Sequence, residues 1–345
     1  MLLRRSQRPV VDAIEALVGL QAQLPMNPYI GLWSRLEEFD PEVLSNLLAE
    51  RAVVRVALMR STIHLVSARD CLELRPLVQV ASERGYRAAF GKGASGLDVD
   101  AVVRAGRAIL TEQPLPAAAL GKRLQVQWPQ YAPDVLANLV RTHVPLVQVP
   151  PRGLWGKSGA SAHVPADVWL GAPLAQHPSL DEMLLRYVAA FGPATVQDAQ
   201  TWSGLTKLGE AFDRLAPRLI TFRDEKGRTL YDLPDAPRPP ADVDAPPRFL
   251  PDFDNLLLSH ADRNHVVADE HRAVFMANNF VIGTVLIDGW VGATWKVARS
   301  ATSATLAVDL LRKCGKTTLD AVTAEGERLL KMLAPGSADH DIRVA

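Results

Sequence analysis

Cysteine, net charge and long apolar runs are all scarce in this chain. Its two cysteines, Cys71 and Cys314, stand far apart among 345 residues, so they give neither a disulfide framework nor zinc-ligand spacing. The longest uncharged apolar stretch, residues 273–287, includes two asparagines and is shorter than the roughly 20 apolar residues of a membrane-spanning helix. Arg4 and Arg5 precede no apolar segment of the kind found in a secretory signal. We expect a cytoplasmic protein with no zinc and no membrane span.

An excess of positive charge is also missing. The chain has 38 Lys and Arg against 38 Asp and Glu, whereas nucleic-acid-binding proteins usually carry a basic surface. The balance argues against tight, sequence-independent coating of DNA but leaves room for a local basic face. The chain has two groups of basic residues whose members are close in sequence. An ordinary solvated surface is the first explanation for both groups. They are Arg51, Arg55 and Arg60, and Arg84, Arg87 and Lys92.

Helix and strand patterns divide the chain into five segments. In the first two, helical spacing is followed by runs rich in β-branched residues, at 53–66 and at 144–149. Helices followed by strands are typical of a winged helix. We therefore predict an α+β fold, mainly helical, with tandem winged-helix units and a small β-containing C-terminal domain. The predicted boundaries are 1–92, 97–165 and 178–235 for the winged-helix units, 236–250 for a proline-rich linker and 251–345 for the C-terminal domain.

The third unit shows this pattern most clearly. Ser179 with Glu182 and Thr195 with Asp198 predict two helix starts, since a hydroxyl three residues before an acid is typical of a capping box. A third helix and a hairpin turning at 224–227 follow. Helix-turn-helix plus a hairpin is the winged-helix arrangement.

The last segment has a different pattern. Asp288-Gly289 suits a tight hairpin turn between short apolar strands. A further strand and a closing amphipathic helix are expected after this hairpin. The predicted elements are strands at 280–287, 290–297 and 302–308 and a helix at 317–333.

Gln21-Ala22-Gln23 places two neutral amides where a helix must stop. Pro25 biases Leu24 away from the α region, so the chain is predicted to be extended near the pair. Residues two apart point to the same side of an extended segment, so both carboxamides can converge on one small target. An arbitrary glutamine is more often a solvated surface residue.

The sequence around this pair resembles the AlkZ/YcaQ-like family of winged-helix DNA glycosylases. The resemblance spans nearly the whole chain, in residues 10–36, 60–66, 250–263 and 288–295. It implies a glycosylase whose catalytic element is the double-glutamine motif, Gln21 and Gln23; YcaQ-like relatives carry Asp at the second position. It also implies a helix ahead of residues 2–5 that this sequence does not contain, so we expect the support of the catalytic loop to be incomplete there.

Glutamine chemistry limits the reaction. The side chain neither gains nor loses a proton near pH 7, but two amides can hold one water in a fixed direction. An N7- or N3-alkylated purine is a cation and leaves as a neutral base, so it needs no general acid. We therefore expect a monofunctional glycosylase with no cofactor and no lyase activity, hydrolysing the glycosidic bond of such purines. Bulky adducts and interstrand crosslinks are its candidate substrates, and double-stranded DNA is its partner. We expect a monomer that associates with the nucleoid.

Other polar residues are candidates for supporting roles. Thr62 and His64 stand two apart on a predicted strand and can share one face, although a lone histidine there is more often structural. Residues near 254–263 lack the oxygen spacing of a calcium loop, and capping is their leading explanation. The candidate DNA contacts are Arg60, Asn255, His260, Arg263, Asp288, Gly289 and Trp290.

Two non-catalytic interpretations remain open at this point. Winged helices most often serve recognition, so the chain can be a DNA-binding protein such as a transcriptional regulator. A paralogue that binds alkylated DNA or a small ligand without cutting is the other alternative. Operator binding without base release favours the first, and selective adduct binding without turnover favours the second.

Overall fold

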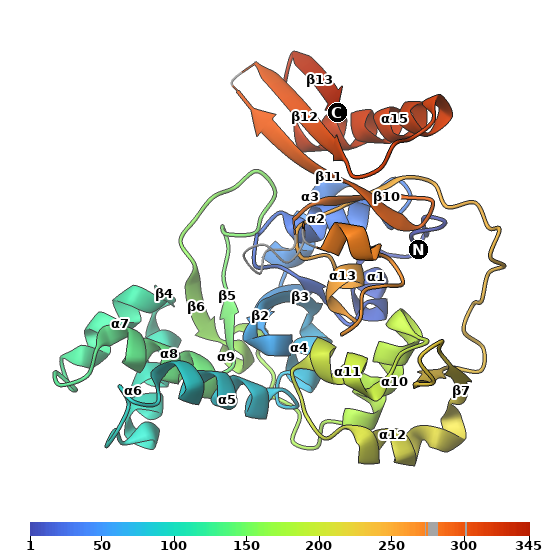
Figure 1. The fold of residues 1–345 in the computed structure, drawn as a ribbon. Helices are drawn as coiled ribbons and strands as arrows, with labels where there is room; N and C mark the ends of the chain where they lie inside the picture. Colours follow the sequence, from blue (N-terminus) through green and yellow to red (C-terminus); the bar gives the residue numbers. More distant parts are fainter. Residues whose placement is uncertain (273, 275–281, 301) are drawn as a thin grey trace. The chain divides into compact units, whose positions relative to one another are not determined.

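The computed structural model describes residues 1–272, 274, 282–300 and 302–345, which form two compact units. The larger unit consists of Pro9–Met26 and Asp40–Ala236. The smaller unit combines Met1–Arg8, Asn27–Phe39 and Pro237–Ala345, so it joins the start and the end of the chain. Figure 1 labels the elements of both units.

Eleven helices of the larger unit are described. They are α1 (Val10–Ala16), α3 (Pro41–Ala49), α4 (Ala68–Leu74), α5 (Gln79–Phe90), α6 (Val99–Glu112), α7 (Ala117–Gln125), α8 (Pro133–His143), α9 (Ala166–Leu170), α10 (Leu180–Phe191), α11 (Val196–Ser203) and α12 (Gly209–Leu215). Short 3-10 turns occur at Met59–Ser61 and Ala216–Arg218.

The strands of the larger unit form a six-stranded sheet and a separate hairpin. The sheet order is β1-β3-β2-β5-β6-β4. Its members are β1 (Leu20–Gln21), β2 (Val53–Ala57), β3 (Ile63–Ser67), β4 (Leu115–Pro116), β5 (Leu146–Gln148) and β6 (Ala162–Pro165), while β7 (Ile220–Arg223) and β8 (Thr229–Asp232) form the hairpin.

Long-range pairing unites the first two predicted segments in this sheet. The predicted strands within 53–66 and 144–149 are confirmed as β2, β3 and β5. β2 pairs with both β3 and β5, in antiparallel register. Residues 1–92 and 97–165 therefore share one hydrogen-bonded sheet, a pairing that local sequence patterns do not specify.

The predicted pattern of residues 178–235 is confirmed as α10, α11, α12 and the β7–β8 hairpin. Thr195 and Asp198 form a reciprocal capping box at the start of α11. Ser179 caps α10 only in one direction, by accepting from the backbone N–H of Glu182. α11 ends at Gly204, whose φ of 78° fits the left-handed conformation that glycine adopts without strain.

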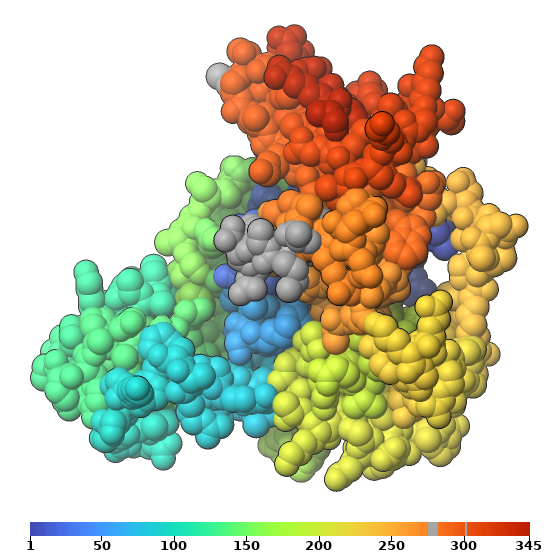
Figure 2. Space-filling model, viewed as in Figure 1, coloured from blue at the N-terminus to red at the C-terminus, as the bar shows by residue number. Residues whose placement is uncertain are grey.

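Two apolar cores stabilise the larger unit. The first packs the valines of β2 and β3 against α10 and α11, and includes Val56, Leu184 and Trp202. The second lies among α6, α7 and α8, where Leu110 and Leu136 are fully buried. α5 lies against α8. Figure 2 shows the molecular surface, coloured by residue number.

The smaller unit is a five-stranded sheet with helices. The sheet order is β13-β12-β11-β10-β9. The described elements are α2 (Asn27–Trp33), β9 (Arg248–Leu250), α13 (Asn255–Leu258), a 3-10 turn at Asp269–His271, β10 (Thr284–Ile287), β11 (Trp290–Arg299), β12 (Ser303–Leu310), α15 (Lys316–Leu333) and β13 (Asp339–Val344).

The predicted hairpin turn is confirmed. Asp288 and Gly289 have φ angles of 53° and 79°, as a two-residue type I′ turn requires. The prediction that the helix at 317–333 closes the chain is wrong, because β13 follows it and pairs in parallel with β12. Residues 280 and 281 of the predicted first strand lie outside the described residues, and the end of the predicted linker forms β9.

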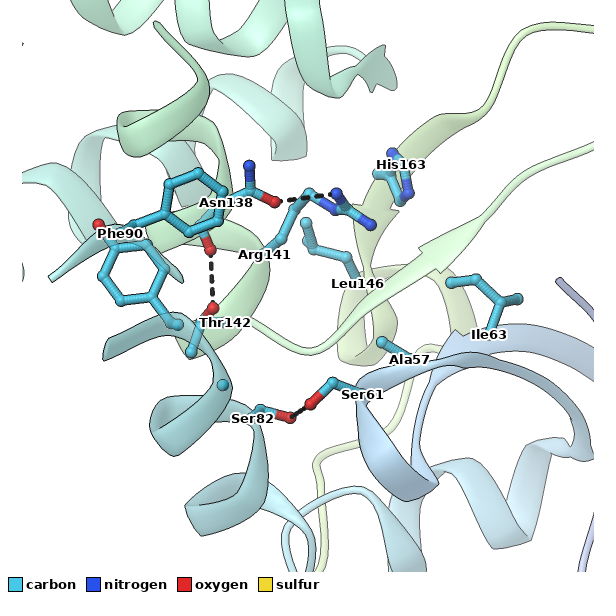
Figure 3. A pocket seen from close by; sticks show the side chains of 12 residues that line it. Ala57, Ser61, Ile63, Ser82, Phe90, Asn138, Arg141, Thr142, Leu146 and His163 are labelled. Carbon is cyan, nitrogen blue, oxygen red and sulfur yellow. Dashed lines mark hydrogen bonds between the residues drawn. The ribbon is translucent and has the colours of Figure 1, made fainter. Parts of the chain in front are cut away.

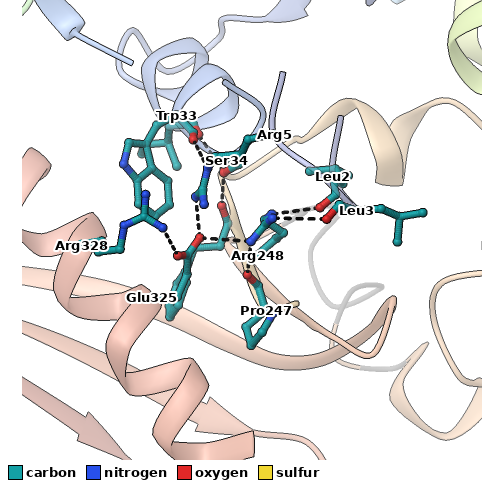
Figure 4. A network of polar contacts seen from close by, with 11 residues as sticks. Leu2, Leu3, Arg5, Trp33, Ser34, Pro247, Arg248, Glu325 and Arg328 are labelled. Carbon is teal, nitrogen blue, oxygen red and sulfur yellow. Dashed lines mark hydrogen bonds and ion pairs between the residues drawn. The ribbon is translucent and has the colours of Figure 1, made fainter. Parts of the chain in front are cut away.

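A buried ionic cluster joins the N-terminal segment to this sheet (Figure 4). The carboxylate of Glu325 on α15 contacts Arg5 at 2.5 Å, Arg328 at 3.0 Å and Arg248 at 3.6 Å. Arg5 also lies over the ring of Trp33, 4.8 Å from its centre. One carboxylate therefore holds three guanidinium groups from distant parts of the sequence.

The predicted α+β class, mainly helical, is confirmed. In the described parts of the chain, no helix has both the length and the apolar character needed to cross a membrane.

Candidate active site

A tight turn after α1 delivers the glutamine pair. The N–H of Gly19 donates to Ile14 and that of Val18 to Glu15, as in a Schellman C-cap. Val18 and Gly19 have φ angles of 52° and 89°, and a positive φ is unusual for a β-branched residue. The helix therefore ends at Ala16, earlier than Pro25 implied. The predicted extended backbone is confirmed at Gln21 by β1, which ends there and does not include Gln23.

The turn before β3 and the first residue of β3 hold the two glutamine side chains. In the β1–β3 pairing Gln21 faces His64. The Oε1 atom of Gln21 accepts from the guanidinium of Arg60 at 3.3 Å, and the Oε1 atom of Gln23 accepts from the backbone N–H of Ile63 at 3.3 Å. Gln21 is only 6% exposed, whereas Gln23 is exposed. The two carboxamides are therefore tied to one short segment of the chain.

Arg60 sits in a strained turn beside the pair. Its φ of 55° and ψ of 21° are left-handed, and Ser61 follows with a φ of 59°. The guanidinium donates both to Gln21 and to the carbonyl oxygen of Trp202. A Cβ at Gly204 would lie 3.2 Å from the Arg60 Cα, so Gly204 permits this close approach. A non-glycine residue keeps a left-handed conformation only where the surrounding structure holds it there. Such residues cluster at functional sites.

His64 is a neutral member of the site. Its side chain is 2% exposed, and its Nδ1 lies 2.9 Å from the carbonyl oxygen of Thr62. A carbonyl only accepts, so Nδ1 carries the proton and Nε2 keeps its lone pair. Burial and the charge of Arg60 lower the His64 pKa to about 3, against a smaller opposite effect of the Thr62 carbonyl. His64 is therefore no source of protons near pH 7.

Thr62 makes a local contact. Its hydroxyl donates to the carbonyl oxygen of Met59 at 3.1 Å, which fixes the turn before β3. The structure thus gathers Gln21, Gln23, Arg60, Thr62 and His64 in the larger unit.

Arg55 is a site residue that the sequence patterns missed. It is 1% exposed on β2, and its guanidinium donates at 2.6 Å to the carbonyl oxygen of Ala22, between the two glutamines. Gly153 packs against it, since a Cβ there would lie 2.9 Å from the Arg55 Cδ. The surface explanation for the cluster of Arg51, Arg55 and Arg60 is therefore wrong for Arg55. A charge within the apolar run at 53–56 was the available signal.

Similarity to known proteins identifies the family of this chain. Residues 14–332 match the family model described as DNA glycosylase AlkZ-like. The chain belongs to the AlkZ-like DNA glycosylase family. It is 26% identical over 327 residues to the interstrand DNA cross-link repair glycosylase of Streptomyces sahachiroi, covering 85% of this chain and 83% of that protein. The solved structure of Streptomyces sahachiroi DNA glycosylase AlkZ has the same fold, with a TM-score of 0.77, 22% identity and coverage of 100% and 95% of the two chains.

Family membership confirms the resemblance and the expectation of an enzyme. This AlkZ-like chain is a DNA glycosylase rather than a regulator, the first alternative above. The roles of individual residues, Gln21 and Gln23 included, stay predictions.

The other predicted DNA contacts of this AlkZ-like protein lie in the smaller unit. Asn255 and His260 are buried, and Asp254 before them caps α13. Asp254 also accepts two hydrogen bonds from Arg35, at 2.9 and 2.7 Å. Burial lowers the pKa of the Arg263 guanidinium. The structural explanation, capping and internal pairing, therefore holds for Asp254.

The hairpin tip of the smaller unit is open to solvent. Trp290 is 42% exposed beside the turn formed by Asp288 and Gly289. Asp288 pairs with Arg312 at 3.0 Å. Among the described residues, no group of three or more His, Cys, Asp or Glu is arranged to hold a metal ion.

Proposed function

We propose that this glycosylase excises cationic N7- or N3-alkylpurines from double-stranded DNA, with Gln21 and Gln23 positioning the attacking water. The observation that carries the proposal is the neutral state of the histidine beside Gln21. His64, the histidine paired with Gln21, is neutral because its pKa is about 3. A neutral histidine that supplies no proton suits a base that already carries positive charge.

The side-chain amides of Gln21 and Gln23, fixed by hydrogen bonds, orient the attacking water. Arg60 donates a hydrogen bond to the Oε1 atom of Gln21, and the Ile63 N–H donates one to the Oε1 atom of Gln23, so both amides are ordered before substrate arrives. Preordered dipoles favour the transition state because they need little reorganisation during the reaction. Water directed at the anomeric carbon then completes hydrolysis as the neutral base departs.

The name of a relative supports the proposed substrate range. The Streptomyces sahachiroi relative is named for interstrand DNA cross-link repair. We extend bulky adducts and crosslinks between purine nitrogens to this chain as substrates, and propose that it acts as a monomer in the cytoplasm on nucleoid DNA, without lyase activity.

The test is release of free alkylguanine from a duplex with one N7-alkylguanine. Gln21→Ala and Gln23→Ala are each expected to slow single-turnover release by about 10²-fold, because misplaced reacting groups cost on that order. Gln130→Ala, at an exposed glutamine outside the site, is the matched control and should keep wild-type release. A duplex crosslinked through N7 atoms tests unhooking on a denaturing gel.

Thermal unfolding must first show that the variants fold. Full release by both folded glutamine variants contradicts the catalytic assignment. Excision of uracil without release of N7-alkylguanine contradicts the choice of a cationic leaving group.

A further inference from the structure

A cavity of about 240 Å³ lies within the larger unit, between the six-stranded sheet and helices α5 and α8 (Figure 3). Its walls combine two aromatic rings with several polar side chains. They are formed by Ala57, Ser61, Ile63, Ser82, Gly85, Tyr86, Phe90, Asn138, Arg141, Thr142, Leu146 and His163.

This cavity lies on the opposite face of the sheet from Gln21 and His64. In the sheet register Ala57 faces Ile63, and both line the cavity. His64 faces Gln21, one residue along β3, so these side chains leave the opposite face of the sheet. β3 therefore contributes to the glutamine site on one face and to the cavity on the other.

The cavity holds an uncompensated positive charge. Arg141 donates to the Oδ1 atom of Asn138 at 3.1 Å, and no carboxylate among the described residues lies within ion-pair distance of it. The described lining contains no aspartate or glutamate. Burial lowers the pKa of Arg141, as expected for a cation withdrawn from water without a counter-charge.

His163 adds a buried ring to the same wall. It is 5% exposed, and neither ring nitrogen makes a well-aligned hydrogen bond, although the backbone near Leu115 and Ser161 acts to raise its pKa. Burial and the nearby Arg141 outweigh that effect and lower the pKa to about 4. In Figure 3 the Arg141 side chain extends toward His163. A ligand with acceptor oxygens would satisfy both residues.

We propose that this cavity binds a phosphate group, held by Arg141 with hydrogen bonds from His163 and the hydroxyl of Ser82. The planar guanidinium matches the paired oxygens of phosphate, and Arg is favoured where phosphate is recognised. Two sources share this chemistry: a backbone phosphate of DNA and a free phosphate-bearing molecule. The DNA source rests on the proposed function, and there a bound phosphate would fix the duplex relative to β3.

The first arm of the test measures duplex binding by fluorescence anisotropy at several salt concentrations. Arg141→Gln is expected to weaken binding about tenfold and to reduce the salt slope by about one, as for a lost phosphate contact. Arg123→Gln removes an equal charge from the exposed face of α7, outside the cavity, and serves as the matched control. A neutral methylphosphonate moved along the duplex should weaken wild-type binding at one position and leave Arg141→Gln unaffected there.

Gly85→Met is designed to fill the cavity while keeping the charge of Arg141. A Cβ at Gly85 meets only the Ser61 Oγ, at 3.8 Å, so a longer side chain can enter the space without a backbone clash. This variant should lose the same binding as Arg141→Gln while retaining Arg141. It keeps the proposal testable if Arg141→Gln fails to fold.

The second arm measures thermal stability with inorganic phosphate. Stabilisation of the wild type but not of Gly85→Met, with no methylphosphonate effect, identifies a free phosphate-bearing molecule as the source. Absence of both effects overturns the proposal. Because each arm reads binding rather than base release, failure here is distinguishable from failure of the glutamine mechanism.

Discussion

His64 and His163 show how burial decides the chemistry of a residue. Both are nearly inaccessible, and both have a pKa lowered by burial and by a neighbouring arginine, to about 3 and about 4. Local sequence patterns do not separate them from ordinary histidines. The neutral His64 supplies no proton beside Gln21, which fits the proposed cationic leaving group.

The two histidines predict a pH-dependent stability. Unfolded histidine has a pKa near 6.5, so below that pH the unfolded chain binds more protons than the folded chain. The free energy of unfolding should therefore fall as pH drops from 7 to 5, by at most about 2 kcal/mol per histidine. Urea unfolding at pH 5, 6 and 7 measures this decline.

Between pH 7 and pH 5 the free energy of unfolding should fall less steeply for His64→Gln than for the wild type. His177→Gln, at an exposed histidine, is the control and should keep the wild-type decline. An unchanged slope in His64→Gln would show that His64 is not held neutral by the fold.

The turn between α1 and β1 is the element that matters most for the glutamine pair. Its left-handed φ angles at Val18 and Gly19 turn the chain from the helix into the strand within three residues. Helical spacing and Pro25 predicted where the backbone becomes extended. They did not predict the end of the helix, because the left-handed Val18 is held by its surroundings rather than by local preference.

Gly19→Ala tests this element. The residue has a φ of 89°, and an added Cβ would lie 2.7 Å from the Val66 Cγ1 and 3.1 Å from the Leu65 carbonyl oxygen. We expect a loss of about 1–3 kcal/mol in stability and slower base release, since β1 must shift. Chemical denaturation and single-turnover release measure the two effects.

Gly209→Ala is the matched control, because an added Cβ there has no neighbour within 4 Å. It should keep wild-type release. Wild-type stability and release in Gly19→Ala would show that the turn tolerates a side chain.

At the scale of the whole molecule, the smaller unit joins segments from both ends of the chain. Glu325 anchors this joining, with Arg5, Arg248 and Arg328 around its carboxylate. Arg328 pairs with Glu325 locally, three residues along the helix, but no local pattern relates Glu325 to Arg5, which is 320 positions away. Figure 4 shows the side chains converging from separate segments.

Glu325→Gln should destabilise the smaller unit strongly. Removing the carboxylate leaves the buried guanidinium groups of Arg5 and Arg248 without their shared partner, and such a loss costs about 3–5 kcal/mol. Hydrogen exchange should accelerate in Met1–Arg8, and thermal unfolding should occur at lower temperature. Glu327→Gln, exposed on the same helix, is the control. Equal protection of Met1–Arg8 in both variants would contradict an anchoring role for Glu325.

Residue types and their spacing were enough to predict many local elements and to recognise the family. The Thr195–Asp198 capping box and the Asp288-Gly289 turn depend on contacts between near neighbours, so residue types alone specify them. The glutamine pair and the segments around it were likewise recognisable from the amino-acid sequence alone. Three features depend on the folded chain: the neutral state of His64, the burial of Arg55 with its hydrogen bond to Ala22, and the pairing of β2 with β5. These depend on solvent exclusion and on contacts between distant residues, which arise when the chain has folded.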